Sequence, residues 1–524
     1  MNFVKITGIF LFILLRCSLL ICDDVDWSFP PYTLSSLSQN ASDPQLAMDT
    51  NGNVVAVWME DEWVTSASML IDGMWSDAVT VSNSGASSPR IAIDANSNAT
   101  VVWVENGFIK TATQPLNGNW SSPIILSTAR ASSPEIAVDP SGNIVVVWAR
   151  DGGIESATKL INEDWPSSPD IISSDGGDFP QVAIGASRHV VAVWHAFINS
   201  KQRICSASKP VNGQWSTVEI ISDPSHNSTR TQIAVDSNGN AIAVWYRYDS
   251  IDSIYSNVVV QAASQPANGN WTAPVDLSDP GIYNPFKLIA HVAFDGSGNA
   301  IAVWNQSFDG STFSVESAIR LVNENWTQSV EIAALNLYAL DVDLAVNSLG
   351  DAFISYMFYD KASSTICIQT TESDLTPYTK NKWPGSTIIS KETNNAWPRI
   401  TACFYGKTTN VVALWMSFDG TTNIIQSATG VDTFFYPPTD LSVTQKEKDW
   451  GVFKEYFNIL SWQPSLYPDT DGYLIYRNGV LINTVDASTL QIIDHNRGKQ
   501  ESVTYGIAAC EGISQSAIVY ITFP

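Results

Sequence analysis

Apolar and polar residues alternate along most of this chain in a pattern that returns about every 45 residues. A phrase of the form Pro-x-Ile-Ala-Val-Asp-x-x-Gly-Asn-x-x-x-Val-Trp marks each return. In the third copy it predicts strands at 135–138, 144–148, 155–160 and 165–173. The second of these runs is apolar throughout, which is typical of a strand covered on both faces. Gly, Pro, Asn and Asp separate the runs, and nothing helical intervenes.

Eight copies of this pattern can be found along the chain. Four begin at Pro44, Pro89, Pro134 and Pro180, three end at Trp245, Trp304 and Tyr356, and the last spans Pro398 to Trp415. Four short strands repeated many times predict an all-β fold, a β-propeller over residues 23–430 with repeats of about 45–60 residues. We predict eight blades, with seven as the alternative if the copy at 342–390 is misassigned.

The eighth copy ends near Thr429 without a fourth strand, and the start of the mature chain carries the missing piece. Residues 27–35 match the fourth strand of other copies, such as residues 120–127. We therefore expect an N-terminal strand to close the ring, which removes the exposed edge of the last sheet.

The repeat ends before a tail whose residues resemble a fibronectin type III domain, over 437–524. The resemblance rests on Pro437-Pro438-x-x-Leu441, on Trp462, on Tyr473–Gly479 and on Tyr505–Ala509. It implies a second β-sandwich that acts as a spacer or adhesion module, with no enzyme site.

Residues 1–22 have the features of a signal peptide. Lys5 precedes a short apolar run, Ile9–Leu15, which is too short to cross a membrane, and no later stretch is apolar enough to do so. We expect a secreted or cell-surface protein that is a monomer. A lipid anchor at Cys22 is the alternative, but Ile21 stands where such signals carry a small residue.

The net charge of −25 argues against nucleic acid as a partner, since no cluster of Lys and Arg is present. The Asp of each Asp-x-x-Gly-Asn turn is a lone carboxylate, whereas calcium sites use several. We interpret these Asp side chains as hydrogen-bonding their own turns, and we predict no metal and no cofactor. The Trp that ends each second strand is interpreted as packing between blades rather than as a sugar platform.

Candidate binding residues come from the places where the copies differ. The segments between the second and third strands lengthen from the fourth copy onward, from 149–154 to 246–257 and 305–315. In propellers these loops emerge on one face together with the loops from a fourth strand to the next first strand, of which 279–288 is also long. The loops of this face combine aromatic and carboxylate groups, which suits carbohydrate or polypeptide binding. The predicted binding residues are Tyr246, Tyr248, Asp249, Tyr255, Tyr283, Phe286, Phe308, Asp309, Phe313 and Trp397.

The overall plan resembles sialidase-type secreted propellers, but their specific marks are missing. Ser173–Gly177 lacks the Trp of the Asp-box. Sialidases clamp the substrate carboxylate with three arginines, and here only Arg90 and Arg399, at equivalent repeat positions, suggest such a clamp. No catalytic residue is predicted. The sequence favours a non-catalytic binding or adhesion protein for a glycan or protein, and the alternative is a secreted glycoside hydrolase or sialidase-like enzyme using carboxylates such as Asp249 and Asp309.

Overall fold

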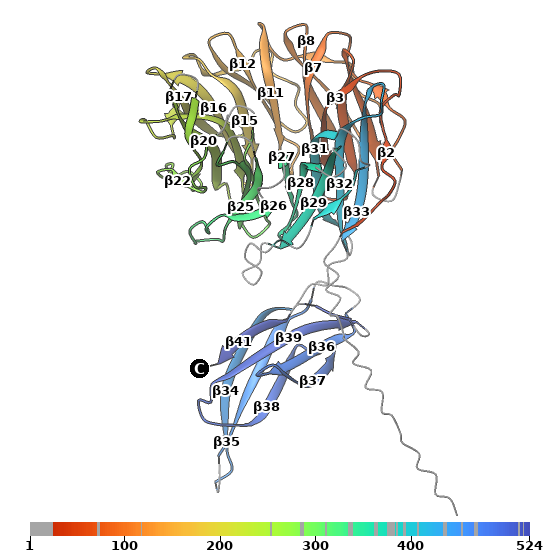
Figure 1. Ribbon diagram of the computed structural model, residues 1–524. Coiled ribbons are helices and arrows are strands. Elements are labelled where there is room, and N and C mark those ends of the chain that lie inside the picture. Colours follow the sequence, from red (N-terminus) through yellow and green to blue (C-terminus); the bar gives the residue numbers. More distant parts are fainter. Residues whose placement is uncertain are drawn as a thin grey trace, which may run out of the picture. The chain divides into compact units, whose positions relative to one another are not determined.

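The computed structural model describes residues 25–524 apart from short gaps (Figure 1). The gaps are 71–73, 117, 252–253, 283–287, 310–311, 334–338, 361–364, 375–382, 384–385, 391–394, 406–407, 433–437, 452–453, 466–469, 512–513, 517 and 524. The chain divides into two compact units, one spanning Val25–Thr433 and the other beginning at Phe434. Each unit is described by itself.

The first unit is a succession of antiparallel sheets, each built from strands consecutive in the chain. The first sheet contains β3 (Ala41–Met48), β4 (Val54–Glu60), β5 (Trp63–Met69) and β6 (Val79–Thr80). The second contains β7 (Ala86–Ile93), β8 (Ala99–Glu105), β9 (Phe108–Gln114) and β10 (Ile124–Ile125). The third contains β11 (Ala131–Val138), β12 (Ile144–Arg150), β13 (Gly153–Lys159) and β14 (Asp170–Ser173). The fourth contains β15 (Asp178–Ile184), β16 (His189–Ile198), β17 (Lys201–Pro210) and β18 (Glu219–Ile220).

The following sheets repeat this order. The fifth contains β19 (Asn227–Val235), β20 (Ala241–Ile251), β21 (Ile254–Gln265) and β22 (Val275–Asp276). The sixth contains β23 (His291–Phe294), β24 (Ala300–Gln306), β25 (Ser314–Arg320) and β26 (Val330–Ala333). The seventh contains β27 (Ala339–Val346), β28 (Asp351–Asp360), β29 (Thr365–Asp374) and β30 (Thr387–Ile388). The eighth contains β31 (Asn395–Tyr405), β32 (Thr408–Phe418) and β33 (Asn423–Asp432), joined by β1 (Asp26–Trp27) and β2 (Tyr32–Thr33).

These sheets form a ring with their first strands on the inside. The first strand of each sheet contacts the first strand of the next, from β3 and β7 through to β27 and β31. The ring closes because β3 also contacts β31, β32 and β33, so the two ends of this unit lie side by side (Figure 1). Radial four-stranded antiparallel sheets around one axis are a β-propeller.

The N-terminal segment completes the eighth sheet, as the repeat pattern predicts. Trp27 lies opposite Gly430 and Thr33 lies opposite Gln426 on β33, both antiparallel. The backbone N–H of Leu34 donates to the carbonyl of Ile425 at 2.9 Å. The outer edge of β33 is therefore paired rather than exposed.

The aromatic residues that end the second strands are core residues. They are at most 1% exposed, and they are Trp58, Trp103, Trp148, Trp194, Trp245, Trp304, Tyr356 and Trp415. Clusters that span neighbouring sheets contain these rings, as with Trp194 packed among residues of β12 and β16. Their packing interpretation holds, because no face of these rings is open to a sugar.

The Asp residues of the repeated turns accept hydrogen bonds from the turns themselves. Oδ1 of Asp139 accepts from the N–H groups of Ser141 and Asn143, each at 2.9 Å, and Oδ2 accepts from Nδ2 of Asn143 at 2.7 Å. The same three bonds recur at Asp49, Asp94, Asp236 and Asp295. These carboxylates thus hold the turns between first and second strands in shape.

Replacing one of these carboxylates is expected to destabilise the propeller without any metal being involved. Asp139→Ala removes three hydrogen bonds at a side chain that is 1% exposed, so the free energy of unfolding should fall by about 3 kcal/mol. Chemical denaturation measures this loss, with the exposed Asp175→Ala as the control. A melting temperature of the wild type that falls on adding a chelator of divalent cations would contradict the interpretation.

The second unit contains two antiparallel sheets. One has the strand order β34 (Thr439–Asp449), β35 (Lys454–Gln463), β38 (Gln491–Arg497). The other joins β37 (Val480–Asp486), β36 (Gly472–Arg477), β39 (Val503–Glu511) and β40 (Ser514–Gln515), with β41 (Val519–Phe523) also on β39. Their inner faces share one core that includes Trp462, Tyr473 and Tyr505.

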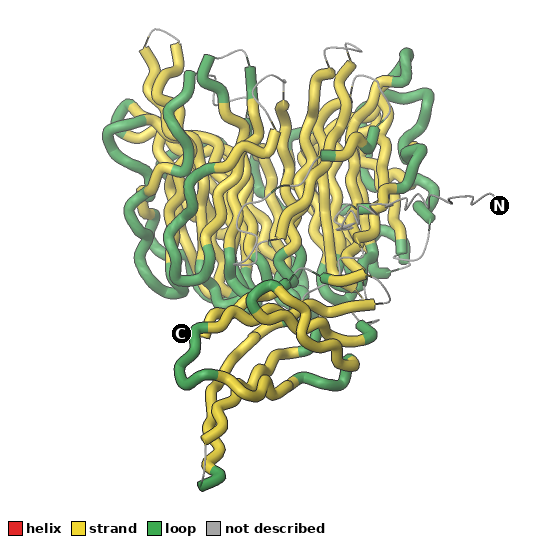
Figure 2. Tube along the Cα trace, turned by 60° about the horizontal axis from the view of Figure 1, so that its bottom comes forward, coloured by secondary structure: helices red, strands yellow, loops and turns green. Residues whose placement is uncertain are grey.

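Helices are not part of either unit in the described residues, which are strands and loops (Figure 2). Accordingly, that part of the chain has no helix long and apolar enough to cross a membrane.

Candidate functional site

The innermost strands carry a bulge at one repeated position. The pairing of the first and second strands shifts register there, for example between Ser132 and Glu135 of β11. In seven sheets, the residue two positions before the one where regular pairing resumes has a left-handed backbone, with φ between 47° and 55°. These residues are Asp43, Ser88, Ser133, Phe179, Arg230, Asp341 and Trp397.

A ring of polar side chains follows the bulge, at the first position where regular pairing resumes. Each member lies opposite the residue that precedes the buried aromatic of the second strand, as Arg90 lies opposite Val102 and Arg399 opposite Leu414. The eight members, all partly exposed, are Gln45, Arg90, Glu135, Gln181, Gln232, His291, Asp343 and Arg399. We call this set the inner ring. Because first strands form the inner edge of every sheet, these side chains line the axis of the propeller.

The inner-ring side chains of the first four sheets form one network, which Gln45 joins through Asp43: Nε2 of Gln45 donates to Oδ1 of Asp43 at 3.3 Å. Nε of Arg90 donates to Oε2 of Glu135 at 3.3 Å, and a further nitrogen of Arg90 lies 3.7 Å from Oδ1 of Asp43. Nε2 of Gln181 donates to the same oxygen of Glu135 at 3.2 Å. Burial raises the pKa of Glu135, and the Arg90 charge opposes that rise. This half of the ring is a continuous network across sheet boundaries.

The sixth to eighth sheets contribute a second cluster. Nδ1 of His291 lies 3.4 Å from Oδ1 of Asp343, whose Oδ2 accepts from the backbone N–H of Ile400 at 2.9 Å. Burial lowers the pKa of His291, which favours the neutral imidazole. Burial also raises the pKa of Asp341, an effect that the nearby Arg399 opposes.

Two large aromatic side chains occupy the bulge position, Phe179 in the fourth sheet and Trp397 in the eighth. Each is 42% exposed, although a large apolar side chain normally gains by burial. The guanidinium carbon of Arg230 lies 4.9 Å from the centre of the Phe179 ring. A left-handed backbone costs a residue with a bulky side chain about 1–2 kcal/mol, and such strain concentrates at functional sites. Phe179 and Trp397 are therefore the best candidates for ligand-contacting aromatics.

Two of the aromatic residues predicted to bind ligand lie in the core instead. Tyr246 is fully buried and its hydroxyl donates to the carbonyl of Asn305 at 3.3 Å. Tyr248 is 5% exposed, and its hydroxyl donates to Oε1 of Gln202 at 2.8 Å. Burial raises the pKa of both phenols, that of Tyr248 to about 12. The expected loop is in fact a lengthened hairpin of β20 and β21, and it turns both rings into the core.

Other predicted binding residues differ in burial and in hydrogen bonding. Asp249 accepts from Nδ2 of Asn257 across its hairpin at 2.9 Å, and its Oδ1 lies 3.9 Å from Nε2 of His226. Asp309 accepts from the N–H of Thr312 in its own turn at 2.8 Å. Tyr255 and Phe313 pack, partly buried, against the core of the fifth and sixth sheets. Phe308 is 42% exposed.

Three predicted binding residues remain. Trp397 lies on the inner strand β31, next to the inner ring. Tyr283 and Phe286 lie outside the described residues.

The corrected role of Tyr246 predicts a variant that alters stability alone. Tyr246→Phe removes the hydrogen bond between the buried hydroxyl and the carbonyl of Asn305, so the free energy of unfolding should fall by about 1 kcal/mol. Ligand affinity should stay within about twofold of the wild type in a binding titration. A large loss of affinity in the folded variant would restore Tyr246 to the site.

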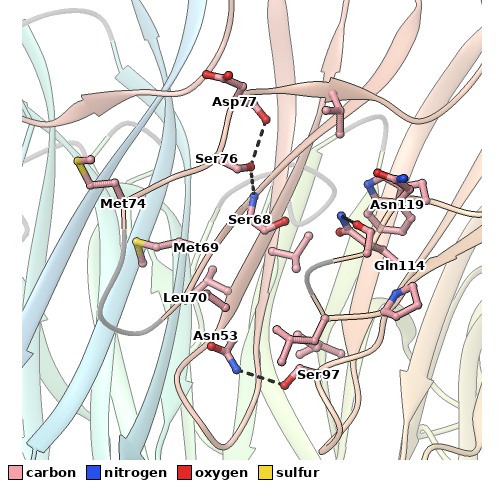
Figure 3. Close-up of a pocket in the computed structure, with 18 of the residues that line it drawn as sticks. Asn53, Ser68, Met69, Leu70, Met74, Ser76, Asp77, Ser97, Gln114 and Asn119 are labelled. Carbon is pink, nitrogen blue, oxygen red and sulfur yellow. Dashed lines mark hydrogen bonds between the residues drawn. The ribbon is translucent and has the colours of Figure 1, made fainter.

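A groove of about 690 Å³ lies outside the inner ring, between the first and second sheets (Figure 3). Its described lining includes the apolar side chains of Met69, Leu70 and Met74. Nε1 of Trp120, which also borders it, donates to Oγ of Ser66 in the neighbouring sheet at 2.7 Å. The groove thus follows the seam between two blades, and none of its described lining residues belongs to the inner ring.

Comparison with known proteins yields distant structural likenesses. No protein-family model matches the chain, and no curated protein does. An ulvan lyase, described as a new polysaccharide lyase family, is 9% identical with a TM-score of 0.43, covering 77% of this chain and 96% of its own. A six-bladed fucose-recognising lectin of Aleuria aurantia is 11% identical with a TM-score of 0.32, covering 58% of this chain and 98% of its own.

A third solved structure, the propeller domain of the trilobed protease of Pyrococcus furiosus, is 11% identical with a TM-score of 0.38. It covers 65% of this chain and 96% of its own. These likenesses are too distant to carry an argument about ligand or activity.

Proposed function

We propose that the propeller unit binds carbohydrate at its inner ring, without catalysing a reaction, as part of an exported or cell-surface protein. The observation that carries this proposal is Trp397, an aromatic side chain left 42% exposed in a strained left-handed backbone two residues before Arg399. Sugar sites combine flat aromatic faces with planar hydrogen-bonding groups such as Arg, Gln and carboxylates, and the inner ring supplies both.

The ligand-binding surface in this proposal lies on the first strands of the sheets. It does not lie on the hairpins that join second and third strands, which we call the outer hairpins. Phe179, at the same bulge position four sheets away, gives the ring a second exposed aromatic group. The three Gln residues of the ring bring both donors and acceptors, which suit sugar hydroxyls. A glycan array probed with the full chain tests the proposal. Binding to at least one glycan class is expected, and an array without signal contradicts it.

The proposal of a non-catalytic role has its own test. Of the two carboxylates considered for hydrolysis, Asp249 accepts from Asn257 across its hairpin and lies beside His226, and Asp309 is held within its own turn. Incubation of the full chain with the glycans that it binds should release no reducing sugar. Turnover that Asp249→Asn or Asp309→Asn abolishes would establish a glycoside hydrolase instead.

We further propose that the ring has eight blades and that the second unit is a fibronectin type III domain acting as a spacer. The strand order of the sheets in the first unit supports the first part, with β1 and β2 completing the eighth sheet. In the second unit, a sheet of β34–β35–β38 faces a sheet of β37–β36–β39–β41, the arrangement expected for that domain type. Export rests on the signal-like residues 1–22.

A further inference from the structure

The order of the inner ring places a neutral side chain between two arginines. Gln45 of β3 stands between Arg399 of β31 and Arg90 of β7, because β3 contacts both of those strands. We call these three residues the Gln45 sector. Two sheets further on, the same position holds Glu135, whose carboxylate accepts from Arg90 and from Gln181. The repeat itself thus shows how this position holds a carboxylate.

The two arginines are oriented alike but differ in their counter-charges. A guanidinium nitrogen of each donates to the carbonyl of the preceding proline, at 2.7 Å for Arg90 and 2.8 Å for Arg399. Arg90 also has carboxylates at 3.3 Å and 3.7 Å. Among the described residues, no carboxylate forms an ion pair with Arg399.

The acidic groups near Arg399 do not neutralise it fully. Asp343 is engaged by His291 and by the backbone N–H of Ile400. Asp341 stands at the bulge position before it, where burial raises the pKa of the carboxyl and the charge of Arg399 opposes that rise. Since no carboxylate among the described residues forms an ion pair with Arg399, its guanidinium can donate to a ligand.

We propose that the Gln45 sector binds an anionic substituent, a carboxylate or a sulfate ester, of the glycan bound at the inner ring. This inference rests on the proposed carbohydrate binding. The guanidinium of Arg399 is the main donor, because its fork matches two oxygens of one anion. Trp397, two residues earlier on the same strand, stacks on the sugar that carries the anion. The ligand anion lies between Arg399 and Arg90, as the carboxylate of Glu135 lies between Arg90 and Gln181.

The charge of the whole protein separates this contact from non-specific attraction. At a net charge of −25 the chain repels an anionic glycan over long distances, and salt screens that repulsion. Affinity for the anionic glycan should therefore stay level or rise as salt is increased. A steep loss of affinity with salt, as for a polyelectrolyte on a basic surface, would contradict the proposal.

The test compares three probes on the full chain: an oligoglucuronate, the same oligosaccharide after reduction of its carboxyl groups, and a sulfated form of that neutral product. The wild type should bind at least one charged probe about tenfold more tightly than the neutral one, and the charged probes together tell carboxylate from sulfate recognition. Arg399→Gln should remove this preference, and Arg399→Lys should retain part of it. Equal affinity of the wild type for all three probes, or a preference that Arg399→Gln leaves intact, would overturn the inference.

A second variant tests the Gln45 sector by placing a carboxylate of the protein in it. Gln45→Glu places a carboxylate between two arginines, where it should compete with the ligand anion. It also removes the donor that Nε2 of Gln45 provides to Oδ1 of Asp43 at 3.3 Å, so chemical denaturation checks that the variant is folded. The preference for charged probes is expected to fall about tenfold. Gln214→Glu adds the same charge at an exposed position of the fourth sheet outside the inner ring and should leave most of the preference. An equal loss in both variants would show a general charge effect and refute a local site, whereas absent binding of every glycan tested would refute the proposed function itself.

Discussion

Deleting residues 25–36 is expected to destabilise the propeller by roughly 5 kcal/mol or more while the second unit stays folded. The deletion removes β1 and β2 from β33 and uncovers a paired edge. It also removes Leu34, which is 7% exposed in the core of the first sheet, and the partly buried Trp27. Two large apolar side chains contribute about 1.5–3 kcal/mol each, and the lost backbone hydrogen bonds add to this.

Differential scanning calorimetry of the full chain measures this effect as a lower melting temperature for the propeller transition. The exposed Phe29, at 68%, offers a matched control, since Phe29→Ala changes the same segment without touching its pairing. If the deletion leaves the melting profile of the wild type unchanged, the N-terminal strands do not close the ring.

Replacing Trp397 by glycine is expected to abolish glycan binding while leaving the fold intact. An aromatic hot-spot residue commonly contributes about 2 kcal/mol or more to binding, so affinity should fall about thirtyfold. Glycine adopts the φ of 51° without strain, and this relief of about 1 kcal/mol offsets the packing lost from a side chain that is only half-buried.

Titration of the glycan found on the array, together with chemical denaturation, separates the two effects. The free energy of unfolding of Trp397→Gly should lie within about 1 kcal/mol of the wild type. Phe308→Ala, at an equally exposed aromatic on an outer loop, serves as the control and should keep its affinity. The opposite pattern would move the site from the inner strands to the outer hairpins.

The fold could be predicted from the sequence because one physical requirement recurs in every repeat. Each unit needs a tight turn, a strand apolar on both faces and an aromatic residue to pack between blades, so the same residue types return at the same spacing. Asp139 and Trp148 are typical, and their turn and core positions follow from the pattern.

The repeated phrase does not predict the inner ring, because the position concerned holds a variable residue. Arg90 and Arg399 stand out by their charge, whereas Glu135, His291 and Asp343 at the same position share no residue type with them. The signal in the sequence is a position that changes identity from copy to copy and is polar in all eight. A structural position in a symmetric fold keeps one residue type, whereas a ligand-binding one differs between repeats.

The prediction for Tyr246 and Tyr248 is wrong for a different reason. A longer segment between two strands suggests a loop. However, Tyr246 and Tyr248 are two residues apart, and side chains at that spacing share one face of a strand. The alternation predicts a lengthened hairpin with both rings turned inward, as observed.

A crystal structure of the full chain with a glycan selected on the array would locate the binding site. We expect a sugar ring stacked on Trp397, with hydroxyl or anionic oxygens within hydrogen-bonding distance of the inner ring. A glycan bound instead along the outer hairpins, beside Tyr255 and Phe308, or in the groove bordered by Met74 and Trp120, would contradict this expectation.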